Sequence, residues 1–238
     1  MYSLFLIDQV PLGGTYQLVG DEAHHALKVL RIESGERVHL SDGAGNWASG
    51  VVSEIEKKSL AIDIQESGFE EAEATQVIVI QAIPKGDRVR EAIELLTEAG
   101  VDEILPWQAH RSIGKSEKGS DKWRVAAREA TKQSRRFRIP KVHDVASTKE
   151  LLTMISGSAC ILLHESATQK ISEVAQSFSA QSGKIYLIIG PEGGITDEEI
   201  EAFRLAGAKV AHLGRPILRS AHAGIAAIAA IKSALGIW

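Results

Sequence analysis

The chain has 238 residues, of which 44% are hydrophobic and 24% charged, and its formal net charge is −4. This length holds one large domain or two modest ones, and the composition is ordinary for a soluble globular protein. No apolar run is long enough to span a membrane, and the single cysteine, Cys160, excludes an internal disulfide and a cysteine-cluster metal site. The first residues lack the basic region and cleavage site of a secretory signal, so we expect a cytoplasmic protein.

The charge is unevenly distributed along the chain. Residues 1–74 carry 5 basic and 13 acidic side chains, whereas residues 75–145 carry 14 and 10. Within residues 111–141 there are 11 basic and 3 acidic side chains. A cluster of this kind is typical of contact with a phosphate backbone, so the sequence predicts an RNA-binding surface despite the negative net charge.

The N-terminal part is predicted to be a small β-barrel. Its strand signals are short apolar and β-branched runs, separated by turns such as 42–46. The predicted strands cover residues 4–7, 37–41, 47–55 and 60–64. A short helix is predicted over 21–29, because its apolar residues share one face. We assign this domain to residues 1–70, and we interpret the charged stretch 69–74 as the linker to a second domain at 75–238.

The second domain begins with a buried apolar run at 76–83, QVIVIQAI, which predicts a strand. An amphipathic helix over 87–99 ends at Gly100, and a strand at 101–105 follows. A further helix over 123–134 carries a basic stripe. The stripe is formed by Arg124, Arg128, Lys132 and Arg135.

A charged stripe is usually a solvated helix face. This stripe lacks compensating acids and continues into Arg136 and Arg138, so contact with RNA is the favoured interpretation. Phe137 lies within the same basic run. It either stacks on RNA or packs on its own domain.

The last third of the chain alternates strands and helices, which predicts an α/β fold with a parallel sheet. The predicted elements cover residues 159–164, 171–177, 184–189, 197–206, 210–213 and 221–235. The stretch GPEGGIT at 190–196 joins one of these strands to a helix. Its glycines permit a tight turn and a close approach of the main chain to a ligand.

A capping box of Thr196 and Glu199 predicts that the helix after this turn starts at Asp197, and Gly207 is expected to end it. The stretch has neither the spacing of the dinucleotide fingerprint nor the lysine of a P-loop. A plain turn between strand and helix is therefore the alternative to a ligand-binding turn.

A second glycine-bearing stretch, Leu213–Gly214 followed by Leu218–Arg219, comes after the next apolar run. Together with Gly190–Gly194 it resembles the C-terminal signature of the SPOUT methyltransferases. It is most similar to the bacterial family that methylates N3 of a uridine in 16S ribosomal RNA. Agreement with that family extends over nearly the whole chain. The agreeing stretches are His24–Arg31, Thr97–Pro106, Arg111–Ser112 and Glu129–Pro140.

The resemblance implies a C-terminal SPOUT domain, an α/β-knot with a parallel sheet and a deep trefoil knot, preceded by a PUA-like β-barrel. It implies S-adenosylmethionine as cofactor, bound by three turns that follow strands. The implied cofactor-binding residues are Leu163, His164, Glu165, Gly190, Pro191, Glu192, Gly193, Leu213, Gly214, Ile217, Leu218 and Ala223. It also implies a homodimer with the C-terminal helix at the interface, and 16S ribosomal RNA or the small ribosomal subunit as partner.

The methyl group of the cofactor is already activated as a sulfonium, so no metal is expected, and no metal-ligand motif occurs. The protein has to align the uracil nitrogen with the methyl carbon and stabilise the uracil anion with a cation. Arg219 is the first candidate for that cation and Arg111 the second. The general base could be Glu98, Glu192 or His222. After Leu218–Arg219 the family often has Thr or Ser, then Glu and Thr, whereas this chain has Ser220, Ala221 and His222.

RNA contacts are expected from basic residues of both domains. The candidates are His24, Lys28, Arg31, Lys85, Arg111, Arg128, Arg135, Arg136 and Arg138. Two alternatives stay open on the sequence: a methyltransferase of the same fold that acts on a ribose 2′-hydroxyl or on transfer RNA, and an RNA-binding protein without catalysis. A nicotinamide oxidoreductase is a more distant alternative, because the dinucleotide fingerprint is missing.

Overall fold

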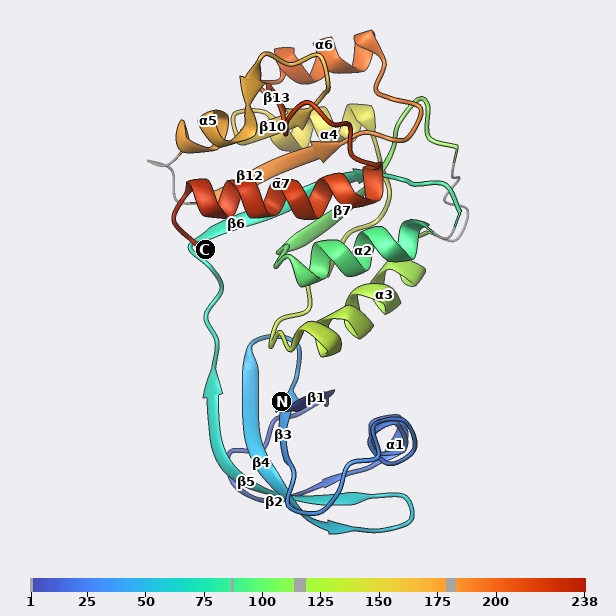
Figure 1. Ribbon diagram of the computed structural model, residues 1–238, viewed down its shortest axis with the longest axis vertical. Helices are drawn as coiled ribbons and strands as arrows, with labels where there is room; N and C mark the ends of the chain where they lie inside the picture. Colours follow the sequence, from blue (N-terminus) through green and yellow to red (C-terminus); the bar gives the residue numbers. More distant parts are fainter. Residues whose placement is uncertain (1, 87, 114–118, 179–182) are drawn as a thin grey trace. The chain divides into compact units, whose positions relative to one another are not determined.

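A computed structural model describes residues 2–86, 88–113, 119–178 and 183–238 (Figure 1). The chain divides into two compact units. The first is Met1–Ala72 with Thr131–Ile139, and the second is Glu73–Ala130 with Pro140–Trp238. The division falls within helix α3 (Gly119–Ser134), whose last residues belong to the first unit.

The first unit is a β domain with one helical segment (Figure 1). Its elements are β1 (Ser3–Leu6), β2 (Gly14–Leu18), α1 (Gly20–His24), the π-helical turn η1 (His25–Leu30), β3 (Arg37–Ser41), β4 (Asn46–Ile55) and β5 (Leu60–Phe69). The described strands form a five-stranded sheet of order β1-β3-β4-β5-β2, in which β1 and β3 are parallel and the other pairs antiparallel. The four predicted strands and the predicted helix are therefore confirmed, and β2 is an addition.

One core lies within this unit, and every strand contributes to it. Phe5, Leu18, Leu40, Val52 and Ile62 come from the five strands in turn and are almost fully buried. Burial of these large apolar side chains stabilises the sheet by about 1.5–3 kcal/mol each. A mixed sheet around a single core agrees with the small N-terminal β domain that the sequence predicted.

The segment 131–139 is built into this same unit. The Phe137 ring stacks on Trp47, with ring centroids 5.4 Å apart and an angle of 12° between the planes. It also meets His39 edge-on at 5.6 Å. The backbone N–H of Gly45 donates to the Phe137 carbonyl at 3.0 Å. Phe137 therefore packs within the protein, but on residues of the first unit and not on the second domain, to which the sequence assigned it.

The second unit alternates strands and helices (Figure 1). Its elements up to the middle are β6 (Thr75–Ala82), α2 (Arg88–Glu98), β7 (Glu103–Gln108), most of α3, β8 (Lys141–Val142), β9 (Ala146–Ser147) and α4 (Thr148–Ile155). The later ones are β10 (Ala159–Leu163), β11 (Gln169–Lys170), α5 (Ile171–Gln176), β12 (Gly183–Ile189), α6 (Asp197–Leu205), β13 (Lys209–His212) and α7 (Ser220–Ala234).

The described strands of this unit form an eight-stranded sheet of order β11-β13-β10-β12-β6-β7-β8, with β9 beside β7. Every strand pair within the described ranges is parallel, which confirms the predicted α/β class. Strand order and register do not define whether the chain threads a loop, so the trefoil knot stays a prediction.

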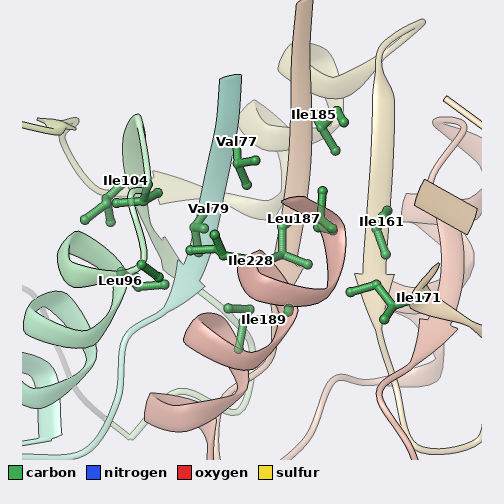
Figure 2. Packing of buried hydrophobic residues seen from close by; sticks show 14 of the residues in the cluster. Val77, Val79, Leu96, Ile104, Ile161, Ile171, Ile185, Leu187, Ile189 and Ile228 are labelled. Carbon is green, nitrogen blue, oxygen red and sulfur yellow. The ribbon is translucent and has the colours of Figure 1, made fainter. Parts of the chain in front are cut away.

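Both faces of this sheet are covered, as is usual for parallel sheets. Val77 and Val79 of β6 point to one face, where Leu96 of α2 and Ile228 of α7 pack against them (Figure 2). The alternate residues of β6 point to the other face, and their core includes side chains of α4 and α6. This sandwich holds the carboxyl ends of the central strands in a fixed arrangement.

Candidate functional site

Three turns lie together at one edge of the parallel sheet. They follow β10, β12 and β13, and β10 pairs with both of the other strands. Because parallel strands end at the same edge, the turns after Leu163, Ile189 and His212 are neighbours. The backbone N–H of His164 donates to the Ala211 carbonyl at 3.0 Å, which links the turn after β10 to strand β13. The three turns are therefore neighbours, and their binding of a cofactor stays a prediction.

The turn at 190–196 has the local structure that its sequence predicted. The backbone N–H of Gly194 donates to the Pro191 carbonyl at 2.9 Å, and Gly194 has a φ of 76°, which favours glycine. Thr196 and Glu199 form the complete capping box at the start of α6. A Cβ atom on Gly193 would lie 3.2 Å from the Arg111 carbonyl oxygen, so a glycine lets the two main chains approach here.

Glu199 does more than cap its helix. Its carboxylate is buried and accepts hydrogen bonds from the backbone N–H of His110 at 2.9 Å and from the Thr148 hydroxyl at 3.2 Å. It also accepts from the Thr196 backbone N–H at 3.2 Å. These contacts join the start of α6 to the segment after β7 and to the start of α4. Glu199 thereby anchors the end of the 190–196 turn to two other segments of the same unit.

The turn after β13 presents apolar side chains to solvent. Ile217 is 78% exposed and Leu218 is 41% exposed, while Leu213 packs partly into the core. Exposed apolar groups next to glycine-bearing main chain fit a flat heterocycle such as adenine, which needs an apolar surface and close backbone approach. The first turn adds His164, whose Nδ1 lies 2.7 Å from the Ser166 hydroxyl, and the exposed Glu165. The residues present therefore fit S-adenosylmethionine.

Two arginines lie beside these turns. Arg111 donates to the Gly193 carbonyl at 3.3 Å. Arg219 is exposed and is the N-cap residue of α7, directly after the third turn. Ala223 is half-buried one turn further along α7 and packs on the core. The structure thus brings both candidate cations next to these turns.

A cavity of about 510 Å³ opens next to the Gly190–Gly194 turn and is lined by Lys85, Gly86, Arg88 and Glu192. Glu192 accepts from the Lys85 backbone N–H and forms an ion pair with Arg88, both at 3.4 Å. Lys85, a predicted RNA contact, therefore adjoins the cofactor turn.

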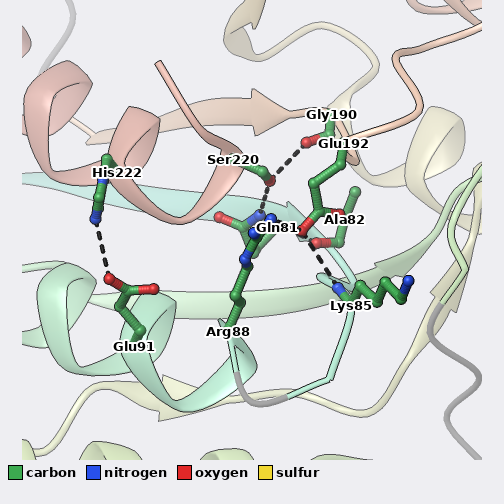
Figure 3. A network of polar contacts seen from close by, with 9 residues as sticks. All are labelled: Gln81, Ala82, Lys85, Arg88, Glu91, Gly190, Glu192, Ser220 and His222. Carbon is green, nitrogen blue, oxygen red and sulfur yellow. Dashed lines mark hydrogen bonds and ion pairs between the residues drawn. The ribbon is translucent and has the colours of Figure 1, made fainter.

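The three candidate bases lie in different surroundings. Glu192 is paired with Arg88, as described above. His222 Nε2 lies 3.0 Å from the Glu91 carboxylate (Figure 3). Glu98 is exposed at the last residue of the 11-residue helix α2, so it lies about 15 Å along the helix axis from Arg88. The structure does not bring Glu98 to the turns.

The predicted RNA-binding residues of the first unit occupy two kinds of environment. His24, Lys28 and Arg31 are exposed along and just after the helical segment, and Arg135 is exposed beyond α3. Arg138 is half-buried and donates to the Glu70 carbonyl at 2.9 and 2.6 Å. Arg136 is also half-buried, whereas Arg128, on the part of α3 that belongs to the second unit, is exposed.

The expectation that the basic stripe lacks compensating acids is wrong. Lys132 is buried and forms an ion pair with Glu22 at 3.0 Å. Arg124 forms ion pairs with Asp121 at 2.8 Å and Asp144 at 2.7 Å. These acids come from other segments or the preceding turn, so the count of acids within the stripe did not show them. Part of the stripe is therefore structural.

Two residues of the site were not identified from the sequence, Gln81 and Ser220. Gln81 is fully buried and donates to the Ser220 hydroxyl, which in turn donates to the Gly190 carbonyl (Figure 3). A polar residue near the end of the apolar run 76–83 was the available signal. It indicated a buried polar contact but not the partner.

Within the described ranges, no helix is long and apolar enough to cross a membrane, and no group of three or more His, Cys, Asp or Glu side chains could hold a metal ion. Cys160 is fully buried in β10, and burial raises the pKa of its thiol to about 12. Cys160 is therefore a small residue of the core.

Comparison with known proteins assigns both parts of the chain. Residues 70–232 match the RNA methyltransferase domain, and residues 18–65 match the RNA methyltransferase PUA domain. The ribosomal RNA small subunit methyltransferase E of Mycobacterium bovis is 39% identical, over 99% of this chain and 93% of its own length. That of Bacillus subtilis is 29% identical, over 94% of this chain and 92% of its own length.

A solved structure agrees with the sequence comparison. The ribosomal RNA small subunit methyltransferase E of Neisseria gonorrhoeae, bound to S-adenosyl methionine, is 28% identical with a TM-score of 0.85, and the match covers 98% of both chains. Family model, relatives and fold agree over nearly the whole length. The chain belongs to the family of RNA methyltransferases with a PUA domain whose members include the ribosomal RNA small subunit methyltransferase E proteins.

Proposed function

We propose that this protein transfers the methyl group of S-adenosylmethionine to N3 of a uridine in 16S ribosomal RNA of the small subunit. The observation that carries the proposal is the meeting of three turns, two of them glycine-bearing, beside Arg111 and Arg219 at one edge of the sheet. The chain that folds in this way is 39% identical to a ribosomal RNA small subunit methyltransferase E. Small ribosomal subunits are the proposed partner, and the cytoplasm is the proposed compartment.

The three turns would hold the cofactor, which supplies a methyl group already activated by its sulfonium. Ile217 and Leu218 would cover the adenine with apolar surface, since both are exposed. The main chain of the 190–194 turn and of Leu163–Glu165 would hold the remaining polar parts. The cofactor-bound relative from Neisseria gonorrhoeae supports this assignment.

The protein's own contribution is orientation and charge. Uracil N3 carries a proton and becomes nucleophilic when it loses that proton, so negative charge develops on the ring. Arg219 would stabilise this charge and Arg111 would assist, because fixed cations that face developing charge lower the barrier. Glu192 and His222 are the candidate bases near the turns, and Glu98 is the least favourably placed of the three.

RNA contact would come from basic residues, most of them exposed, with an unpaired or extruded uridine as the target. The residues proposed for this contact are His24, Lys28, Arg31, Lys85, Arg111, Arg128, Arg135, Arg136 and Arg138. Their number fits binding through phosphates, which weakens as salt rises. Residues 1–74 are mainly acidic, so within that stretch the proposed contacts are limited to His24, Lys28 and Arg31.

We also propose that the protein works as a homodimer through α7. Ala226 and Ala229 are half-buried in the single chain, so small side chains lie on a face that a second helix could approach closely. Light scattering of the purified protein tests this. A mass of two chains is expected, and a mass of one chain at micromolar concentration would contradict it.

Primer extension on small-subunit RNA tests the proposed reaction. N3 methylation blocks base pairing, so treated RNA is expected to stop the polymerase at one uridine. Arg219→Ala should lower kcat by about 10²–10³, the effect of removing one donor that stabilises developing charge. Arg204→Ala, which removes an exposed arginine near the end of α6, is the matched control and should keep wild-type activity.

The alternatives give different results in the same assays. Methylated RNA without a polymerase stop would favour ribose methylation, and methylation of transfer RNA alone would favour the other substrate. Absence of S-adenosylmethionine binding in calorimetry would favour an RNA-binding protein without catalysis.

A further inference from the structure

Gln81 is an unusual residue for its position in β6. It is fully buried, and its neighbours Ile80 and Ala82 are buried apolar residues. Ile80 points to one face of the sheet, so Gln81 points to the other, beneath the start of α7 (Figure 3). A buried amide costs stability unless its polar atoms are hydrogen-bonded. What the amide contacts therefore indicates why it is there.

The amide nitrogen of Gln81 makes two hydrogen bonds. It donates to the Ala82 carbonyl and to the Ser220 hydroxyl, both at 3.0 Å. The Ala82 carbonyl can only accept, so the nitrogen has to face it, and this fixes the orientation of the amide. The amide oxygen has no hydrogen-bond partner among the described residues.

Ser220 continues the chain of hydrogen bonds. Its hydroxyl donates to the Gly190 carbonyl at 2.7 Å. A hydroxyl has one proton, so the proton is used for Gly190 while a lone pair accepts from Gln81. Every bond in this series therefore has one direction, and removal of the hydroxyl would leave both the Gln81 amide and the Gly190 carbonyl without this partner.

The three linked residues come from three separate segments. Gln81 is the last residue but one of β6, Gly190 is the first residue after β12, and Ser220 is the first residue of α7. Gly190 begins the second of the three turns. Ser220 directly follows the third turn, which contains Leu218 and Arg219. The hydrogen bonds thus set the spacing between two of the turns that are proposed to hold the methyl donor.

We propose that Ser220 and Gln81 are positioning residues for methyl-donor binding. They hold the Gly190 carbonyl and the Leu218–Arg219 turn at the separation that S-adenosylmethionine requires, and neither has to touch the donor. The inference rests on the proposed function, since it assigns a role within the same cofactor site.

The variants Ser220→Ala, Ser220→Thr and Gln81→Met test this inference in the full chain. Calorimetry with S-adenosylmethionine gives the Kd, and thermal unfolding without the donor gives the Tm. Ser220→Ala and Gln81→Met should each raise the Kd on the order of tenfold, the effect of one lost buried hydrogen bond. Ser220→Thr keeps the hydroxyl and should bind within about twofold of wild type.

Ser177→Ala is the matched control. The Ser177 hydroxyl likewise donates to a main-chain carbonyl, that of Val174 at 2.6 Å, and accepts from Lys209 at 2.8 Å. Lys209 begins β13, so this hydroxyl lies at the opposite edge of the sheet from the turns. Its loss should leave the Kd unchanged. The double variant with Ser220→Ala and Gln81→Met should bind no more weakly than either single variant, because both remove the same series of bonds.

A lower Tm with an unchanged Kd for Ser220→Ala and Gln81→Met would overturn the inference, because the bonds would then serve stability alone. If Ser220→Ala does not fold, Ser220→Cys replaces it, since a thiol keeps the volume and is a weak donor. An unchanged Kd in Ser220→Cys would equally overturn the inference. A wild-type chain that fails to bind the donor would refute the proposed function, whereas normal wild-type binding with unaffected variants refutes only the positioning role.

Discussion

Lys132 illustrates how the surroundings of a residue decide its role. Its place in a basic stripe predicted RNA contact, yet its side chain is only 7% exposed and pairs with Glu22 at 3.0 Å. Removing one partner of a buried ion pair leaves the other charge uncompensated, which costs several kcal/mol. The role of Lys132 in the first unit is therefore structural.

Lys132→Met should lower the free energy of unfolding by about 3 kcal/mol. Urea denaturation of the purified variant measures the change. Lys122→Met, at an exposed position of the same helix, is the matched control and should change stability by less than about 0.5 kcal/mol. Equal effects of the two substitutions would contradict the structural role.

Glu103 forms a charged cluster away from the cofactor turns, at the start of β7. Its carboxylate contacts His143 Nε2 at 2.5 Å and Lys184 Nζ at 2.5 Å. Burial raises the pKa of Glu103, but hydrogen bonds from Lys184 and His143 outweigh this effect, so the pKa lies below its ordinary value of 4.5. The unfolded chain keeps the ordinary value. The cluster therefore stabilises the folded state above about pH 4.5, and this stability is lost as the pH falls through the lower folded-state pKa.

Glu103→Gln should lower the free energy of unfolding at pH 7 by about 1–2 kcal/mol, the contribution of hydrogen bonds to a charged group. The difference from wild type should shrink as the pH falls below about 4.5. Denaturation between pH 7 and pH 3 measures it. Glu201→Gln, at an exposed position of α6, should show the pH dependence of wild type. A Glu103 deficit that is constant over this range would refute the linkage.

The helix starts show which elements the sequence can predict. The capping box of Thr196 and Glu199 is a local pattern, and α6 begins where that pattern places it. A second complete box at Ser147 and Glu150 begins α4, which we did not predict, because an eight-residue helix gives a weak periodic signal. Strand β2 was also not predicted, because only Leu18 in it is buried and no alternation is visible.

The two boxes also allow a matched comparison of stability. Thr196→Ala and Ser147→Ala should each cost about 1 kcal/mol, the usual effect of losing an N-cap. Glu150→Ala should cost a similar amount, because Glu150 is exposed. Glu199→Ala should cost about 3 kcal/mol, because it removes a buried carboxylate and leaves the His110 backbone N–H and the Thr148 hydroxyl without their acceptor. Equal costs at Glu150 and Glu199 in urea denaturation would contradict the wider role of Glu199.

In the proposed cofactor site, too, the sequence could predict local features but not contacts between distant residues. Its turns could be predicted because each follows an apolar run that forms a central strand. The hydrogen bond between Gln81 and Ser220 joins residues 139 positions apart, and no local pattern pairs them. The sequence could not predict how far Glu98 lies from the turns. That distance depends on the length and direction of α2, which place Glu98 at the helix end away from Arg88.

At the scale of the whole molecule, the two compact units are not continuous stretches of the chain. A linear division at residues 70 and 75 was expected from the charged linker. The first compact unit also contains residues 131–139, whose Phe137 stacks on Trp47. Periodicity describes neighbours along the chain, so it cannot assign such a segment to a distant domain. We propose that this segment is ordered only when it packs on the first domain.

A fragment of residues 73–238 tests the proposal. It lacks the surface on which residues 131–139 pack, so trypsin should cut after Arg135, Arg136 and Arg138 much faster than in the full chain. Cleavage after Arg204 serves as the internal control and should proceed at the same rate in both. Equal protection of the three arginines in the fragment would show that the segment is ordered without the first domain.

The central claim is that the turns at the carboxyl edge of the parallel sheet hold a methyl donor for transfer to a uracil nitrogen. The most direct measurement incubates the protein with small ribosomal subunits and S-adenosylmethionine that carries an isotopically labelled methyl group, followed by mass spectrometry of the RNA nucleosides. Wild type should yield labelled N3-methyluridine, and Arg219→Ala should yield far less of it. Label that appears only on ribose, or on no nucleoside while the protein is folded, would contradict the account.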